Sequence, residues 1–110
     1  MRTPTKPAPE AVTQQVLALG GRIRAARIRR KLRVADLASR ADISAKTLQS
    51  IERGDLGTSI GAHMKVLWAL GLSAELDLIA DPGLDQTGLT LEISAQGKRV
   101  RVKKAVDNDF

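Results

Sequence analysis

Apolar residues recur at a helical spacing over the first two thirds of the chain. Near the start of this region, one helix face holds Leu19, Ile23 and Ala26. Because the pair Gly20-Gly21 lowers helix propensity, we expect a short leading helix over 11–18 and a main helix over 20–31. The preceding residues, 1–10, hold three prolines and little to bury, so we expect a disordered leader there.

Two shorter helices follow, with start and stop signals between them. A helix over 34–41 turns Leu37 and Ala38 inward, and Asp42 suits the turn after it, because Asp tolerates a left-handed backbone. The next helix begins after Ser44, a good N-cap, and Gly54 is suited to end it. Its apolar pair is Leu48 and Ile51. Two short helices joined by a tight turn make a helix-turn-helix candidate.

A fourth helix is expected over about 60–70, capped by Thr58 or Ser59 and ended by Gly71. Its expected inner face consists of Ile60, His63, Met64, Leu67 and Leu70. We expect His63 to be partly buried with a local hydrogen bond. Trp68 lies on another side of this helix, where the C-terminal segment or a second subunit would cover it. The alternative is an exposed anchor for another protein.

After this helix the spacing changes to strict alternation. Residues 73–80 contain the alternating run Ser73 to Leu78, which predicts a half-buried strand, and a turn is expected at Asp81-Pro82-Gly83. The strand needs a partner, and pairing with the same segment of a second chain would bury Ala74, Leu76 and Leu78 of both subunits. The alternative partner is Leu89–Ile93 of the same chain. That segment fits either a hairpin or a helix over 84–95.

The composition excludes several classes of site. With 110 residues the chain has room for one domain, followed here by a C-terminal extension over 81–110. It has no cysteine and a single histidine, which leaves no disulfide scaffold, no metal site and no catalytic triad. No apolar run reaches the ~20 residues that span a membrane, and no signal peptide is expected, so we expect a cytoplasmic protein. We expect no enzyme activity and no cofactor.

Charge is unevenly placed along the chain. The net charge is +6, and residues 1–72 hold 13 basic and 5 acidic side chains, whereas residues 73–97 hold 5 acidic and no basic ones. The stretch Lys98–Lys104 is basic again. A basic body indicates an anionic partner, and DNA fits a basic helical domain.

The helix after Ser44 carries short polar side chains on its outer face. A helix that enters the major groove must be slim there and must present donors and acceptors to base edges. With Leu48 and Ile51 inward, the residues turned outward are Ala45, Lys46, Thr47, Gln49 and Ser50. Lys46 suits guanine and Gln49 suits adenine. A merely solvated polar face is the alternative.

Several of these motifs resemble the XRE helix-turn-helix family, which includes the phage repressors and Cro-like proteins. The resemblance covers about 19–73 and rests on Leu19-Gly20-Gly21-Arg22-Ile23-Arg24-Ala25-Ala26-Arg27, Leu37-Ala38, Ile43-Ser44, Leu48, Ile51-Glu52-Arg53-Gly54 and Leu70-Gly71-Leu72-Ser73. It implies an all-α, lambda-repressor-like bundle of five helices over 11–72, with the third helix reading DNA. It places base contacts at Ala45, Lys46, Gln49 and Ser50, and an interhelical salt bridge between Arg27 and Glu52. The phosphate contacts that we expect on this fold are Lys31, Arg33, Ser44, Arg53 and Thr58, and we expect the arginines of the first helix and the basic tail to add affinity through phosphates as well.

The chain departs from the family at the start of its second helix. Lys31 stands where Gly is common, and Arg33-Val34 replaces the usual Thr or Ser followed by Gln. The N-cap and the phosphate-binding glutamine of that helix are therefore missing, and Arg33 and Lys31 would replace the contact by charge. Ala45 has no hydrogen-bonding group, so it would read a base only by apolar contact.

Within the family, the layout of residues 70–78 looks most like HipB-type antitoxins. That resemblance implies a dimeric repressor of its own operon, bound to a palindromic operator in the nucleoid, with a HipA-like kinase toxin as a further partner. The alternative function is a protein-interaction module of this fold that binds a partner protein without reading DNA sequence.

Overall fold

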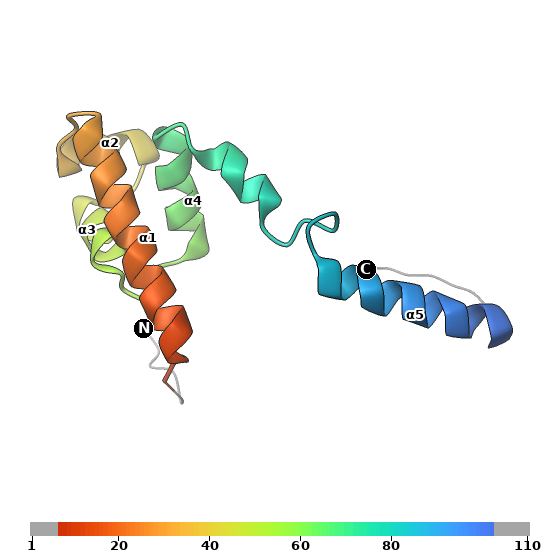
Figure 1. The fold of residues 1–110 in the computed structure, drawn as a ribbon. Coiled ribbons are helices and arrows are strands. Elements are labelled where there is room, and N and C mark those ends of the chain that lie inside the picture. The colour runs from red at the N-terminus through yellow and green to blue at the C-terminus, as the bar shows by residue number, and fades with distance from the viewer. Residues whose placement is uncertain (1–6, 103–110) are drawn as a thin grey trace. The chain divides into compact units, whose positions relative to one another are not determined.

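The structure is a computed structural model that describes residues 7–102. Five α-helices and one 3-10 helix follow one another along the chain (Figure 1). They are α1 Glu10–Arg29, α2 Val34–Ala41, α3 Ala45–Arg53, α4 Ile60–Ala69, η1 Ser73–Leu78 and α5 Gln86–Val102. The chain divides into two compact units between Leu76 and Asp77, which are described separately.

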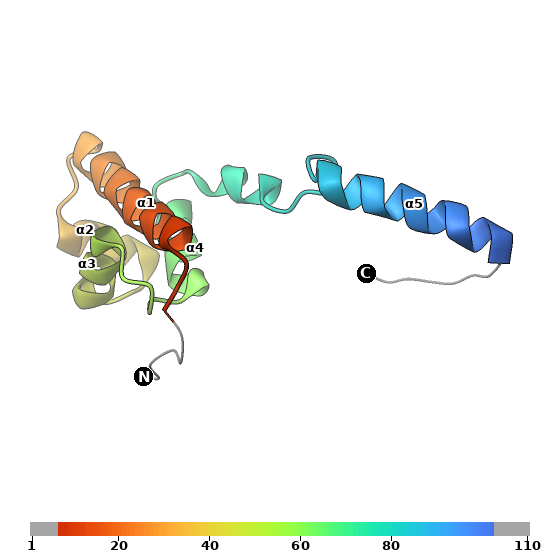
Figure 2. The ribbon, with the colours of Figure 1, turned by 60° about the horizontal axis from the view of Figure 1, so that its bottom comes forward.

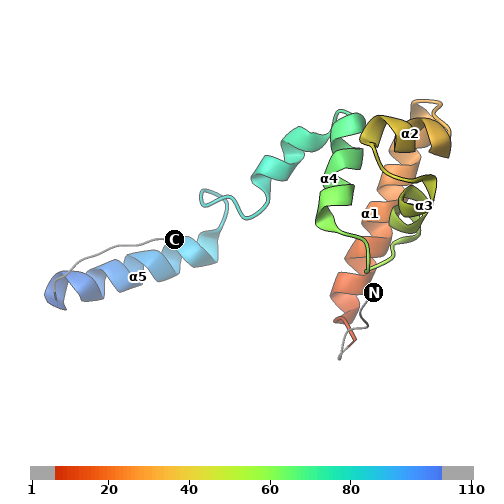
Figure 3. The same ribbon diagram turned by 180° about the vertical axis from the view of Figure 1, so that it is seen from behind.

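In the first unit, four helices enclose one aliphatic core. α1 packs on α3, and α2 packs on both α3 and α4. Figure 2 shows α2 and α3 next to each other beside α1, and the view from behind shows α4 on the other side of α1 (Figure 3). The side chains that are less than 2% exposed come from all four helices: Ile23, Leu37, Leu48, Ile51 and Val66.

Helix α1 is one continuous helix, so the expected break at Gly20-Gly21 is wrong. Gly20 is buried against α3, where a Cβ atom would lie 2.8 Å from the carbonyl oxygen of Glu52 and closer still to that of Ile51. The glycine therefore permits a close approach of two backbones and does not interrupt the helix. Gly21 is exposed. The helix begins at Glu10, within the predicted leader, whose residues 1–6 lie outside the described part of the chain.

The expected signals around α2 and α3 are present. Asp42 ends α2 in the left-handed conformation, with φ 57° and ψ 49°. The Ser44 hydroxyl accepts a 3.0 Å hydrogen bond from the amide of Thr47 and so caps α3. Gly54 ends α3 at φ 79°, where its α-hydrogen faces Leu17 of α1. The two caps fix the length and the direction of α3.

Helix α4 is turned differently from the prediction. Ser59 caps it, but Ile60 is 71% and Met64 is 42% exposed, while Val66, which was not predicted to face inward, is fully buried. Small residues on the inner face, Ala62 and Ala69, let α4 pack closely on its neighbours. Leu67 and Leu70 face the core as expected, and Gly71 follows at φ 79°.

The predicted strand over 73–80 is wrong, because residues 73–78 form the 3-10 helix η1. No strand occurs in residues 7–102, so a strand here would leave its backbone groups unpaired, whereas a 3-10 helix pairs them locally. Of the residues assigned to a dimer strand, Ala74 is exposed, Leu76 is half-buried and Leu78 is 58% exposed. The five-helix bundle is also wrong in its count, because the first unit contains four α-helices and most of η1.

The second unit contains a turn and the helix α5. The predicted turn at Asp81 is present: the Leu84 amide donates to the Asp81 carbonyl at 2.9 Å, and the Asp81 carboxylate accepts from Gly83. Residues 89–93 are helical, so the helix is the correct alternative and the hairpin is wrong. The Asp85 carboxylate accepts a 2.9 Å hydrogen bond from the amide of Gly88 in the first turn of α5.

The two neighbouring glycines of α1 give a matched test of this packing. We expect Gly20→Ala to lower the free energy of unfolding by about 1–3 kcal/mol, because its methyl group collides with the α3 backbone. Gly21→Ala should raise it by about 0.5–1 kcal/mol, since nothing lies within 4 Å and alanine favours the helix. Urea unfolding followed by circular dichroism measures both. Equal stability of the two variants would refute the close approach of α1 and α3.

Candidate nucleic-acid interface

The outer face of α3 carries four exposed side chains in a row along the helix. Ala45, Lys46, Gln49 and Arg53 are exposed, and Ser50 is half-buried beside them. Ala45, Gln49 and Arg53 follow one another at intervals of four residues, and Lys46 lies three residues before Gln49, so these side chains lie on neighbouring turns of one side of the helix. The first turn of α3 is narrow on this face, because the side chain of Ala45 is only a methyl group. Together these side chains offer an ammonium, an amide, a hydroxyl and a guanidinium along one face.

Thr47 lies at the edge of this face and belongs to the cap of α3. Its hydroxyl accepts a 2.9 Å hydrogen bond from the Ser44 hydroxyl, while its amide donates to the same Ser44 oxygen. Thr47 is half-buried and still has a hydroxyl hydrogen to donate. Ser44 is exposed at the start of the helix, next to the partly positive end of the helix dipole.

Arg27 of α1 and Glu52 of α3 form an ion pair behind this face, as expected from the resemblance. Arg27 Nε lies 2.7 Å from Glu52 Oε2, and Nη2 lies 3.0 Å from Oε1, so the pair is bidentate. The two side chains are only 10% and 7% exposed. Hydrogen bonding to Glu52 raises the pKa of Arg27 above its ordinary value. The remaining Arg27 nitrogen, Nη1, donates to the carbonyl of Leu32 at 2.9 Å.

One guanidinium thus connects three parts of the domain. It belongs to α1, holds α3 through Glu52, and holds the segment that leads into α2 through Leu32. That segment includes Lys31, whose backbone has φ 58°. Glycine adopts this conformation more easily than lysine does, so this position is suited to glycine.

The start of α2 shows what replaces the missing N-cap. Arg33 supplies no side-chain acceptor to the first amides of the helix. Instead its own amide donates to Asp36 at 2.8 Å, and its guanidinium lies 3.3 Å from the same carboxylate oxygen. These two contacts hold the pKa of Asp36 below its usual range. The Arg33 side chain is 85% exposed, although its Nη2 also donates to the other Asp36 carboxylate oxygen at 3.4 Å.

The expected phosphate contacts are distributed over three segments. Lys31 and Arg33 are exposed before α2, and Ser44 and Arg53 are exposed at the two ends of α3. Thr58 differs from these, because it is half-buried and its hydroxyl donates to the Asp55 carbonyl at 3.0 Å within the loop before α4. The structure therefore brings Lys46, Gln49, Ser50 and Arg53 together on α3, and it leaves Thr58 engaged in its own loop.

A shallow groove beside α3 contains one arginine of α1, Arg24, which the sequence did not distinguish from the other arginines of that helix. Its lining residues come from α1, α2 and α3: Arg24, Arg27, Val34, Gln49, Glu52 and Arg53. Arg24 is exposed and lies one turn before Arg27 on α1. The spacing of three residues between Arg24 and Arg27 was the available signal, because it places both on the same side of that helix.

Among residues 7–102 no three His, Asp or Glu side chains come together as metal ligands, and no helix there is long and apolar enough to cross a membrane. His63 is half-buried, and its Nδ1 lies 2.8 Å from the Ser59 carbonyl, as expected. Trp68 is 67% exposed.

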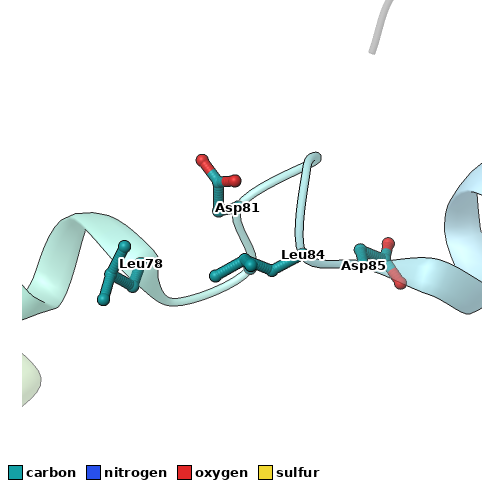
Figure 4. Close-up of a pocket in the computed structure, with 5 residues that line it drawn as sticks. Leu78, Asp81, Leu84 and Asp85 are labelled. Atoms are coloured by element: carbon teal, nitrogen blue, oxygen red, sulfur yellow. The ribbon is translucent and has the colours of Figure 1, made fainter.

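A hollow in the second unit is lined by Leu78, Ala80, Asp81, Leu84 and Asp85. Figure 4 shows that the carboxylates of Asp81 and Asp85 point away from each other. Each also accepts a hydrogen bond from a nearby backbone amide. The two carboxylates therefore do not converge on a common point where a ligand would bind.

Comparison with known proteins identifies the family to which residues 18–78 belong. A family model described as a helix-turn-helix domain matches residues 18–78, more than half of the chain. No curated protein and no solved structure gives a match. The matched region begins within α1, eight residues after its start, and includes α2, α3, α4 and η1.

Removal of one charge from the buried ion pair should lower the stability of the domain. We expect Glu52→Gln to lower the free energy of unfolding by about 3 kcal/mol, because it leaves the buried Arg27 guanidinium without a counter-charge. Asp36→Asn is the matched control, since it makes the same chemical change in the exposed pair with Arg33, where solvent screens the interaction. Chemical unfolding compares the two variants. If both lose the same stability, the buried pair does not hold the domain together.

Proposed function

The chain belongs to the helix-turn-helix domain family, and on that premise we propose that it is a sequence-specific DNA-binding repressor that acts as a dimer. The observation that carries the proposal is the outer face of α3, where Lys46, Gln49 and Ser50 lie together and free of acidic partners among the described residues. A helix of this kind fits the major groove of DNA.

The base contacts follow from the chemistry of each side chain. Lys46 donates to the O6 and N7 acceptors of guanine, and Gln49 pairs with the N6 and N7 edge of adenine. Ser50 and Thr47 each have a hydroxyl that serves as donor or acceptor. Ala45 contributes apolar contact, for which the methyl group of thymine is the matching base feature.

Phosphate contacts position the helix and supply most of the affinity. We assign them to Lys31 and Arg33 before α2, to Ser44 at the start of α3, and to Arg53 at its end. Thr58 completes the assigned set, with its hydroxyl turned from the Asp55 carbonyl to a phosphate. Contacts of this kind do not depend on sequence and weaken as salt rises.

Dimerisation is proposed because a repressor of this class reads two half-sites about 34 Å apart with two copies of one helix. The strand that the sequence predicted for this purpose is absent among the described residues, so dimerisation requires other surfaces. Its support is the amount of apolar surface left exposed, which marks interaction sites: Ile60, Trp68, Ile79 and Leu84 are each more than 60% exposed.

An antitoxin role, with a HipA-like kinase as partner, extends the same proposal. It is supported by the resemblance of Leu70-Gly71-Leu72-Ser73, and the formation of η1 in place of the strand removes its other support. Co-expression with a kinase-like protein from the same operon tests it. A stable complex that still binds the operator is the expected result, and separate elution of the two proteins would refute the antitoxin role.

A second candidate function is a protein-interaction module that does not read DNA. The observation in its favour is Trp68, a large side chain that is 67% exposed on α4, where an aromatic anchor can bind a partner protein. The lack of a side-chain cap at α2 points in the same direction, since the usual phosphate-binding group is missing there.

Fluorescence anisotropy distinguishes these functions. The protein is titrated into labelled DNA from upstream of its own gene and into a scrambled fragment, at two salt concentrations. A dimeric repressor binds the native fragment more tightly at both salts and saturates at two chains per site. Equal binding that high salt abolishes would mean that the positive charge attracts any DNA, and the interaction-module function would then be favoured.

The variant Lys46→Ala tests the reading face. We expect it to cost about 1–3 kcal/mol on the native fragment and to relax discrimination at one base pair, because a base-specific donor is lost. Lys65→Ala removes the same charge from an exposed site on α4 and serves as the control. If Lys46→Ala weakens native and scrambled DNA equally, Lys46 contacts phosphate and does not read a base.

A further inference from the structure

The groove beside α3 is positively charged, and the DNA contacts proposed above do not account for all of this charge. Its floor includes Arg27 and Glu52, whose charges are already satisfied by each other at 2.7 Å. Two further arginines remain on its walls, Arg24 from α1 and Arg53 from α3. The groove therefore has two positive charges with no acidic partner among the described residues.

The two arginines differ in how firmly they are held. Arg53 Nη2 donates a 3.2 Å hydrogen bond to the Ser50 hydroxyl, which holds its side chain along α3. Arg24 has no hydrogen bond to another side chain in the described part of the chain, and it is exposed. The groove is also lined by the amide side chain of Gln49 and the apolar side chain of Val34, neither of which adds negative charge.

Val34 is also the first residue of α2, so the groove reaches the start of that helix. No side chain caps the first amides there, because Arg33 offers no acceptor. The partly positive end of the α2 dipole adds to the field of the two arginines, and the Asp36 carboxylate in the first turn of α2 opposes part of it. Three helices thus contribute positive charge or partial charge to one depression at the edge of the reading face.

On the basis of the proposed function, we propose that this groove binds one phosphate of the DNA backbone, held between the guanidinium groups of Arg24 and Arg53. A guanidinium group can bind a phosphate through two parallel hydrogen bonds, whereas a lysine ammonium acts as a single point charge. In an open groove, the two hydrogen bonds of an arginine hold a phosphate better. A phosphate here compensates for the missing glutamine at the start of α2. Arg24 is thereby a DNA-positioning residue that helps to set the depth of α3 in the major groove.

A phosphate fits this position better than a base does. Gln49 and Arg53 are four residues apart on α3, and Arg24 approaches this side of α3 from α1, at the flank of the reading face. When a helix lies in the major groove, the DNA backbone runs along its flanks, and the base edges face the centre of the helix. The groove residues therefore meet the backbone.

The salt dependence of binding tests this proposal directly. Loss of one phosphate contact should reduce the slope of log K against log salt by about 0.9. We expect Arg24→Ala to show this reduction with native and scrambled DNA alike, without loss of thermal stability. Arg22→Ala is the matched control, because Arg22 is an exposed arginine of the same helix about 200° away from Arg24. It should leave the slope close to the wild-type value.

Two further results separate the possible outcomes. Arg24→Lys should keep the slope but weaken binding several-fold, since lysine keeps the charge and loses the two-pronged contact. Equal slopes for the Arg24→Ala and Arg22→Ala variants, with sequence-specific binding intact, would overturn the groove proposal alone. If the wild-type protein prefers no DNA sequence, the proposed function fails, and a wild-type slope near zero would overturn the groove proposal with it.

Discussion

The arrangement of this domain depends on the ion pair between Arg27 and Glu52. The Arg27 guanidinium on α1 makes two hydrogen bonds to Glu52 of α3 and a third to the Leu32 carbonyl in the segment before α2. One side chain therefore fixes the positions of α1, α2 and α3 relative to one another. The pair is almost fully shielded from solvent, which makes each charge dependent on the other. Gln49, one helical turn before Glu52, and Arg53, the residue after it, line the groove beside Arg24 together with the ion pair.

Backbone proximity reinforces this arrangement. Gly20 lies against the backbone of the last turn of α3, and Gly54 at the end of that helix lies against the backbone and side chain of Leu17, so glycine lets α1 approach α3 closely at two places. Leu48 and Ile51 are fully buried between these contacts. A short helix of nine residues is marginal by itself, and its orientation is set by packing and caps more than by propensity. The polar face of α3 is therefore presented on a rigid support, as specific reading of DNA requires.

Much of the first unit was predictable from sequence, because its signals are local. Ser44, Asp42 and Gly54 mark helix ends by their own chemistry, and the structure shows each in that role.

The wrong predictions concern residues whose structure is determined by contacts with other elements of the fold. From the sequence alone, Gly20 looks like a residue that interrupts a helix, but in the structure it lies within α1 and contacts the backbone of α3. Ile60 is apolar yet 71% exposed, while the smaller Val66 is fully buried in the core. Alternation over residues 73–78 predicted a strand, but a strand needs a pairing partner, and a 3-10 helix does not. The sequence could not distinguish Arg24 from the other arginines of α1, because the groove that it lines is formed with residues of two other helices.

The most direct test of the account is to identify the amides that respond to DNA. In an NMR titration of the isotope-labelled protein with DNA from upstream of its own gene, the largest shifts should occur in residues 44–50 and in the first turn of α2. Smaller shifts should appear at Arg24, and the exposed side of α4 around Lys65 should change little. The opposite pattern, with strong shifts around Trp68 and none along α3, would contradict the claim that α3 reads DNA.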